Sequence, residues 1–478
     1  MKSKTYVSRD FIACMVWGAF LLYRAFVMDI TNDEAYSFML VDKPAVHMLP
    51  TTANTHWLNS FLLALLNGLF GHTVWILRWH VVLAGMGMAW VLRLIFKTIA
   101  PGSLWLFAAS CILLNNYLVD FYSLARGYAL ALPLLCAAFY YLIRSGGQSR
   151  FPVYAFLSVS VLANFTSIYF LLAWSLWDFA DLLRQRKLKL WFSKTGWNER
   201  WPMYLVLSWS LPVILYIKYV TGDLEEGQKN GFLADTLGVF IERSYPFLNH
   251  SMVWYLSLIW ILLLLLFYLL HRRHLERGWR ILFELCGMVI GLIHFNFYVL
   301  HIPFPFGRTS FFFVVPLMLL FCYAITALLQ RAPRTWLQVL TGLMILFQCT
   351  CFMLYRHVDT SLEWSKQQGL SACFRDLYHI EKKQVYHRRL VMSIDHYGCY
   401  ENYYRYLYPD QVPEKLFVYD RSGYESVQPQ DTHFFQEADY LLMYGNYEPF
   451  LDTLLPPTHR KTLKHYPRMQ SDLIQVLH

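Results

Sequence analysis

Two neighbouring acids follow the first long apolar stretch of the chain. Residues 11–28 are apolar enough to enter a bilayer, and Asp33 and Glu34 come shortly after them. A carboxylate is costly to bury in lipid, so an acidic pair at the end of a membrane span indicates a water-facing site. Such a pair can act as a general base for an attacking hydroxyl, or it can hold a cation. A solvated loop pair without function is the alternative interpretation.

Arginines in two later connections offer a complementary chemistry. Asp120 and Arg126 lie in the segment DFYSLARGYAL, and Arg308 lies in HIPFPFGRTSFFF. Arginine is less common in the non-cytoplasmic loops of a membrane protein than in the cytoplasmic ones. Its planar guanidinium group suits bidentate binding of phosphate. We therefore predict that acids and arginines from different loops bind a phosphate-linked sugar at one membrane surface. The alternatives are arginines that reach for lipid headgroups and an Asp120 that caps the following helix.

The predicted first outer loop, residues 29–77, extends this candidate site. It also holds Asn54 and His56, which we include as candidates for substrate binding. A lone histidine is a weak signal, so an interfacial residue with no role in binding is the alternative for His56. The stretch 57–70 is apolar but only 14 residues long, which favours an interfacial or re-entrant helix over a full span.

The composition is that of a polytopic membrane protein. The chain has 478 residues, of which 56% are hydrophobic and 15% are charged. An average soluble domain is about 25% charged. Several segments approach the ~20 apolar residues needed to cross a bilayer. We predict an all-α membrane domain with about 11 transmembrane helices, over 11–28, 78–96, 103–118, 127–143, 151–164, 167–183, 203–220, 251–270, 280–300, 311–329 and 336–354.

The distribution of basic residues predicts the topology. Most Lys and Arg residues of the first 354 positions fall in alternate connections, which places those connections and the N-terminus in the cytoplasm. The odd number of spans then places the C-terminus outside. The net charge of +9 is explained by these loops, so we expect no nucleic-acid partner.

The last part of the chain has a different composition. Residues 355–478 are polar, with short apolar runs at Leu390–Ile394, Leu416–Tyr419 and Tyr440–Met443. We predict that 1–354 form the membrane domain and that 355–478 form a small α/β extracytoplasmic domain. Cys373 and Cys399 are the two cysteines in this polar part, and either a disulfide or two free thiols is compatible with the sequence.

Taken in order, the segments around these residues resemble the GT-C class of integral membrane glycosyltransferases. Relatives in that class include protein O-mannosyltransferases and the aminoarabinose transferases that act on lipid A. The order of the motifs and their outer placement carry the resemblance. The matching segments are Asp33–Tyr36, Thr55–Gly71, Ile76–Arg78, Ser123–Tyr128 and Gly307–Thr309, the last before an apolar span with Pro316.

The resemblance implies a polyprenyl-phosphate-linked sugar as donor and an inverting transfer to an acceptor that the sequence does not identify. It implies Asp33 as the base and Arg126 and Arg308 near the donor phosphate, and we include Tyr128, which lies in the same motif as Arg126, as a candidate for substrate binding. Members often carry His-Pro-Pro-Leu where this chain has His56-Trp57-Leu58-Asn59. Some relatives bind a divalent metal ion, which leaves that cofactor open here. The implied location is a bacterial inner membrane, with the lipid bilayer itself as a partner.

Two functions of other classes remain as alternatives. A lipid or solute transporter should show charges within the membrane and paired Gly- or Pro-broken helices in two related halves. The sequence shows no such repeat, and its informative polar residues gather at one face. A non-catalytic scaffold with an outer binding domain is the other alternative, and the acid–arginine pattern argues against it.

Overall fold

The computed structural model is described over most of the chain. The described residues are 9–42, 56–71, 73–98, 104–221, 230–329, 334–354, 361, 369–381, 389–393, 399–400, 404, 415–419, 435, 437–444, 455–466 and 471–477.

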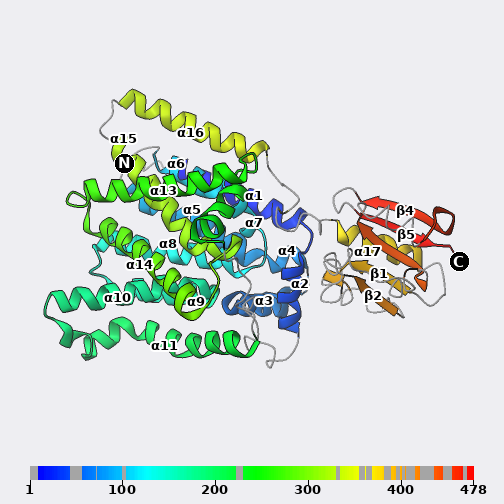
Figure 1. The fold of residues 1–478 in the computed structure, drawn as a ribbon, viewed down its shortest axis with the longest axis horizontal. Coiled ribbons are helices and arrows are strands. Elements are labelled where there is room, and N and C mark those ends of the chain that lie inside the picture. The colour runs from blue at the N-terminus through cyan, green and yellow to red at the C-terminus, as the bar shows by residue number, and fades with distance from the viewer. Residues whose placement is uncertain are drawn as a thin grey trace, which may run out of the picture. The chain divides into compact units, whose positions relative to one another are not determined.

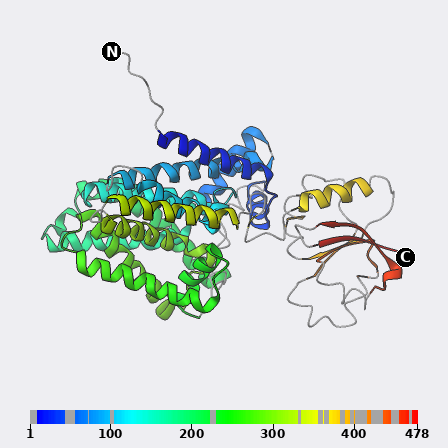
Figure 2. The ribbon, with the colours of Figure 1, turned by 90° about the horizontal axis from the view of Figure 1, so that it is seen from above.

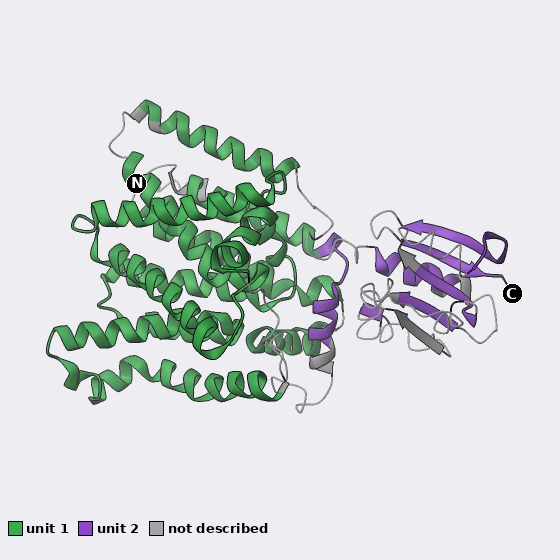
Figure 3. Ribbon diagram, viewed as in Figure 1, with its two compact units in different colours: residues 1–25, 45–356 green, residues 26–44, 357–478 purple. Residues whose placement is uncertain are grey.

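The chain forms two compact units (Figure 3). The first unit comprises Met1–Ala25 and Ala45–Arg356, and the second comprises Phe26–Pro44 and His357–His478. The segment that carries the acidic pair therefore belongs to the same unit as the C-terminal part of the chain, although more than 300 residues separate them.

The first unit is a bundle of helices, most of which run side by side along one direction (Figures 1 and 2). Its α-helices are α1 (Arg9–Val27), α3 (Trp57–Phe70), α4 (Val74–Leu77), α5 (Trp79–Lys97), α6 (Leu104–Leu113), α7 (Asn116–Phe121), α8 (Gly127–Ser145), α9 (Arg150–Ala163), α10 (Ile168–Arg184), α11 (Lys194–Tyr216), α12 (Val239–Ser244), α13 (His250–His271), α14 (Arg277–Leu300), α15 (Phe311–Leu329) and α16 (Arg334–Leu354).

Six helices of the described chain are long and apolar enough to cross a membrane. Each overlaps a predicted span, although Lys194–Val220 begins nine residues before its predicted start, and the number rises to seven if the bent pair Phe11–Val27 and Asn32–Phe38 is counted as one. The protein is thus a multi-pass membrane protein, whereas the number of eleven spans stays a prediction. The six are Trp79–Lys97, Gly127–Ser145, Lys194–Val220, His250–His271, Arg277–Leu300 and Gly307–Leu329.

One predicted span is broken for a local reason. The stretch 103–118 was expected to be one helix, but α6 ends at Leu113 and α7 begins at Asn116. The Asn115 side chain accepts hydrogen bonds from the backbone N–H groups of Tyr117 and Leu118, as an N-cap residue does. Hydropathy does not detect this break, because one capping asparagine changes the average over a long window very little.

Helix α13 has the surface of a helix that faces lipid. Leucines along its length are about half exposed, which a soluble bundle would avoid. Its exposed leucines are Leu256, Leu262, Leu263, Leu265, Leu266, Leu269 and Leu270.

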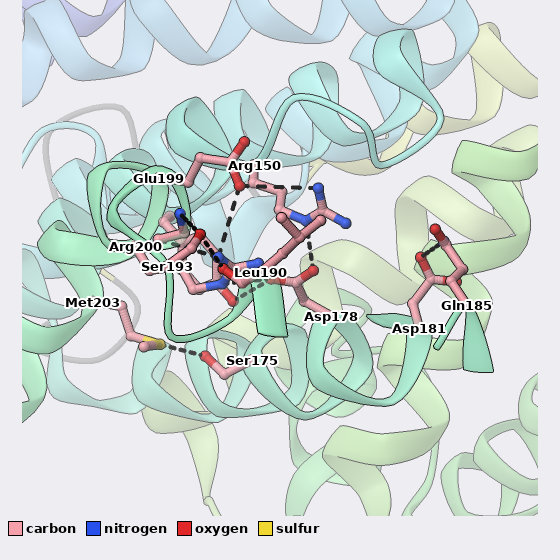
Figure 4. Close-up of polar contacts among 12 residues, drawn as sticks. Arg150, Ser175, Asp178, Asp181, Gln185, Leu190, Ser193, Glu199, Arg200 and Met203 are labelled. Atoms are coloured by element: carbon pink, nitrogen blue, oxygen red, sulfur yellow. Dashed lines mark hydrogen bonds and ion pairs between the residues drawn. The ribbon is translucent and has the colours of Figure 1, made fainter. Parts of the chain in front are cut away.

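A buried ion cluster holds α9, α10 and α11 together (Figure 4). Asp178 of α10 accepts hydrogen bonds from Arg150 Nε at 2.6 Å, from Arg200 Nε at 2.9 Å and from the Tyr154 hydroxyl at 3.0 Å. Asp178 and Arg200 are almost fully buried, so the charges are stabilised by one another rather than by water.

Removal of the acid at the centre of this cluster should destabilise the bundle. We expect Asp178→Ala to lower the free energy of unfolding by about 3–5 kcal/mol, because it leaves two arginines without their buried counter-charge. The measurement is thermal unfolding in detergent. The matched control is Glu199→Gln, because Glu199 is 33% exposed and lies 3.7 Å from Arg200, so its loss should cost no more than about 1 kcal/mol. Equal effects of both variants would contradict the assignment.

The second unit contains a mixed sheet and two described α-helices, α2 (Asn32–Asp42) and α17 (Leu370–Glu381). The strand order is β2-β1-β3-β5-β4, with β2, β1 and β3 parallel and with β5 antiparallel to both β3 and β4. Three strands coincide with the apolar runs in the sequence. The strands are β1 (Arg389–Ser393), β2 (Lys415–Tyr419), β3 (Tyr440–Tyr444), β4 (Arg460–Tyr466) and β5 (Ser471–Val476).

Cys373 and Cys399 are both buried free thiols in this unit. The side of the membrane that the unit faces stays a prediction.

Candidate functional site

The backbone before Arg126 is fixed by buried polar contacts. Asn59 of α3 donates a hydrogen bond from Nδ2 to the carbonyl of Ala125 at 3.0 Å, and its Oδ1 lies 2.8 Å from a ring nitrogen of His80. Arg126 then occupies the position before the first residue of α8, with extended backbone, and its side chain is fully buried. A guanidinium at that depth must be held by polar or anionic groups.

Asp120 lies close by in sequence but has a different partner. It is buried inside α7 and pairs with Arg24 of α1 at 2.5 Å, while Arg24 Nε donates to Ser123 Oγ at 3.3 Å. The capping role considered for Asp120 is wrong, because Arg126 is the residue that precedes α8. The ion pair ties α1 to the segment that ends in Arg126.

His56 lies close enough to Arg126 and Arg308 for the charges of both arginines to act on its ring. It is buried at the start of α3, and its ring packs edge-on against Tyr128 with 5.0 Å between the ring centroids. Burial lowers the pKa of His56 well below its ordinary value, and the charges of Arg126 and Arg308 lower it further. The structure thus brings together His56, Tyr128, Arg126 and Arg308 from three separate connections, and it keeps the imidazole neutral.

A third arginine, which the sequence analysis did not single out, lies beside this group. Arg243 of α12 donates to the Tyr117 hydroxyl at 3.0 Å, and its guanidinium carbon lies 5.2 Å from the centre of that ring. A Cβ atom added to Gly307 would lie 3.8 Å from this guanidinium. We call Arg126, Arg243 and Arg308 the arginine cluster. The only sequence signal for Arg243 was its position in a predicted outer loop.

Aromatic rings form a rigid layer next to the arginine cluster. Phe311, at the start of α15, packs edge-on against Tyr117 and Phe121, each with 4.8 Å between centroids, and against Tyr128 at 5.9 Å. Edge-to-face pairs at these distances are a preferred arrangement of aromatic rings and stabilise the packing of these side chains.

Two glycines allow the close approach of backbone at this site. A Cβ atom on Gly127 would overlap the carbonyl oxygen of Ala163 and lie 2.6 Å from His56 Cγ. Gly307 has a φ of +54°, a conformation that L side chains rarely adopt, and it directly precedes Arg308. Arg126 is thus followed by Gly127, and Arg308 is preceded by Gly307. Replacement of either glycine would displace the arginine next to it.

We expect Gly127→Ala to weaken binding of a lipid phosphate and to destabilise the bundle, because overpacking of this kind typically costs about 1–3 kcal/mol. The measurements are thermal unfolding and binding of a polyprenyl phosphate by the purified protein. Gly291→Ala is the matched control, since no atom lies within 4 Å of a Cβ added there. If both variants bind as the wild type does, the close contact with His56 is irrelevant to the site.

The two residues of the acidic pair, Asp33 and Glu34, lie in the second unit and differ in their structural role. Thr31 and Glu34 form a capping box at the start of α2: Thr31 N–H donates to Glu34 Oε2 at 3.1 Å, and Glu34 N–H donates to Thr31 Oγ1 at 3.3 Å. Glu34 is buried, whereas Asp33 is half-buried in the first turn of α2 and lies outside the capping box. The T-x-x-E spacing was the sequence signal for this role of Glu34.

Asp29 anchors the acidic segment to α17. Its Oδ2 accepts hydrogen bonds from the N–H groups of Gly369 and Ser371 at 3.0 and 2.9 Å, and its Oδ1 accepts one from the Tyr404 hydroxyl at 2.9 Å. A carboxylate at a helix N-terminus is stabilised by the unpaired N–H groups and by the helix dipole. This contact explains why Phe26–Pro44 belongs to the C-terminal unit.

The remaining predicted features have simple outcomes. Asn54 lies outside the described residues. Across the part of the chain that the structure describes, no group of three or more His, Cys, Asp and Glu side chains could hold a metal ion. A divalent metal therefore stays as open as the sequence left it.

The fold is that of a helical membrane bundle with a small mixed sheet in the C-terminal part of the chain. Two solved structures share it: ArnT from Cupriavidus metallidurans in the apo state, with a TM-score of 0.50, and the same protein bound to undecaprenyl phosphate, with a TM-score of 0.52. In each case the identity is 10% and the match covers 97% of both chains. No protein-family model and no curated protein matches the sequence.

Proposed function

We propose that this protein is an inverting glycosyltransferase that moves a sugar from a polyprenyl-phosphate donor to an acceptor at the outer face of a bacterial inner membrane. The observation that carries the proposal is the proximity of Arg126 and Arg308 to a buried, neutral His56, with Arg243 beside Gly307. The GT-C fold, which is shared with an ArnT structure bound to undecaprenyl phosphate, supports a lipid phosphate as the ligand. The N-terminus is then cytoplasmic, and the C-terminal unit lies outside.

The arginine cluster has the chemistry of a phosphate site. Charge-assisted hydrogen bonds from guanidinium to phosphate are short and strong, and each is stronger where water is excluded. The ring of Tyr117 lies under the guanidinium of Arg243, and the ring of Tyr128 packs against His56. The neutral imidazole of His56 can accept or donate a hydrogen bond to the sugar or the phosphate without adding charge.

In the proposed reaction, an acceptor hydroxyl attacks the anomeric carbon of the sugar while the bond from that carbon to the phosphate oxygen breaks. The electron pair of that bond leaves with the polyprenyl phosphate, whose growing negative charge the arginine cluster stabilises. Asp33 takes the proton of the attacking hydroxyl. Glu34 acts indirectly, because its capping box stabilises the first turn of α2, which carries Asp33.

The test is transfer by the purified full chain in liposomes. We would supply undecaprenyl-phosphate donors that carry different radiolabelled sugars, together with cell-envelope lipids and glycans as acceptors. Label should move to one acceptor class, with release of an equal amount of undecaprenyl phosphate. Translocation of intact donor across the bilayer without cleavage would instead establish a transporter. A parallel arm with EDTA decides whether a divalent metal is needed.

A further inference from the structure

A polar cavity of about 380 Å³ lies where the ends of α10, α13 and α14 meet. We call it the basic cavity, because arginine is its commonest residue. It is lined by Trp177, Asp181, Arg184, Tyr268, Arg272, Arg273, Arg277, Arg280, Ile281 and Glu284.

Both carboxylates of the basic cavity, Asp181 and Glu284, accept hydrogen bonds from neighbouring side chains. Glu284 accepts hydrogen bonds from Trp177 Nε1 at 2.7 Å and from the Tyr268 hydroxyl at 3.3 Å. Asp181 accepts from Arg277 at 3.2 Å and from Gln185 at 2.6 Å, the latter drawn in Figure 4. Five arginines and two carboxylates therefore line the cavity, and this excess of positive charge favours an anion there.

The basic cavity is distinct from the arginine cluster. Arg277 lies at the first residue of α14, while the connection that contains Arg308 follows the last residue of the same helix. A helix of 24 residues is about 36 Å long. The charge bias of the loops assigns the end with the basic cavity to the cytoplasm.

The surroundings favour a lipid over a free ion. Leu265 precedes Tyr268 by three residues and Arg272 by seven, so the three share one face of the helix. Leu265 is 50% exposed, and Leu269 is 54% exposed on the next turn. An apolar, lipid-facing strip thus leads to the rim of the cavity, where Trp177 and Tyr268 are residues typical of the membrane interface.

We propose that the basic cavity binds the phosphate headgroup of an anionic phospholipid, with the acyl chains along the exposed leucines of α13. Guanidinium forks suit phosphodiester oxygens, and basic pockets between transmembrane helices at the cytoplasmic side recognise such headgroups. This site is independent of the proposed transferase reaction.

The test compares the delipidated wild type with Arg272→Gln/Arg273→Gln/Arg280→Gln. Phosphatidylglycerol is titrated into protein in detergent, and the thermal unfolding temperature is recorded. We expect a saturable stabilisation of the wild type, with a half-saturating concentration raised roughly tenfold or more in the triple variant, because three phosphate-binding charges are gone.

The matched control is Lys187→Gln/Lys189→Gln/Lys194→Gln, which removes three charges from the connection between α10 and α11 and from the first residue of α11, none of which lines the cavity. It should respond as the wild type does. An equal loss in both triple variants would show a non-specific charge effect and overturn the proposal. Equal stabilisation by inorganic phosphate or by phosphatidylcholine would overturn it as well, since the first needs no lipid and the second no anionic lipid.

Discussion

Replacement of Asp33 by Asn is expected to lower the rate of sugar transfer by about 10²–10⁴-fold, the usual contribution of a general base. An acceptor hydroxyl keeps its proton at physiological pH, and an amide cannot remove it. The folded state should be retained, because Asp33 lies outside the capping box of α2. Binding of the donor should be retained too, since the arginines that we assign to the phosphate are elsewhere in the chain.

Glu34→Gln is the informative companion. Its main expected effect is on stability, because the capping box is a structural contact, and loss of a cap costs about 0.5–2 kcal/mol. The measurements are single-turnover transfer from a lipid-phosphate donor and thermal unfolding. Near-normal turnover of Asp33→Asn, with a large catalytic loss in Glu34→Gln, would move the base to Glu34.

Loss of either predicted arginine should weaken binding of the donor. A charge-assisted contact contributes about 1.5–3 kcal/mol, which is roughly 10–150-fold in affinity, and Arg126→Ala and Arg308→Ala should each show a loss in this range. Lys should restore binding only in part, because one ammonium cannot reproduce the planar fork. Arg243→Ala should also weaken binding, since Arg243 lies beside Gly307.

The control for these variants lies on the same helix as Arg126. Arg144 is in the last turn of α8, is exposed, and donates to the Tyr140 hydroxyl at 2.9 Å. Arg144→Ala should therefore leave donor binding unchanged. The measurement is the dissociation constant for undecaprenyl phosphate in nanodiscs. Wild-type affinity in both Arg126→Ala and Arg308→Ala would assign these side chains to packing or to headgroup contacts.

The sequence predicted those elements whose signal is local and repetitive. Helices such as α13 and α15 were predicted from their long apolar runs, and β1 and β3 from short runs between turn residues. The interruption at Asn115 was missed, because it depends on one side chain that caps a helix.

The contacts between residues that are far apart in the chain could not be predicted from the sequence. The partner of Asp120 is Arg24, 96 residues away, and the anchor of Asp29 includes Ser371, 342 residues away. No pattern in one sequence encodes such pairs. The proximity of Arg126 and Arg308 to His56 followed from placing all three in connections at one face, whereas Arg243 looked like an ordinary exception to the charge bias.

The hydrogen bonds from the start of α17 to Asp29 limit how the chain can be divided or recombined. A chimera made by exchanging residues 357–478 for those of another protein with this fold would leave Asp29 facing a foreign helix, and the acid that we assign to catalysis follows it by only four residues. The exchangeable module is therefore discontinuous. It consists of Phe26–Pro44 together with His357–His478, and a functional graft has to carry both segments from the same parent.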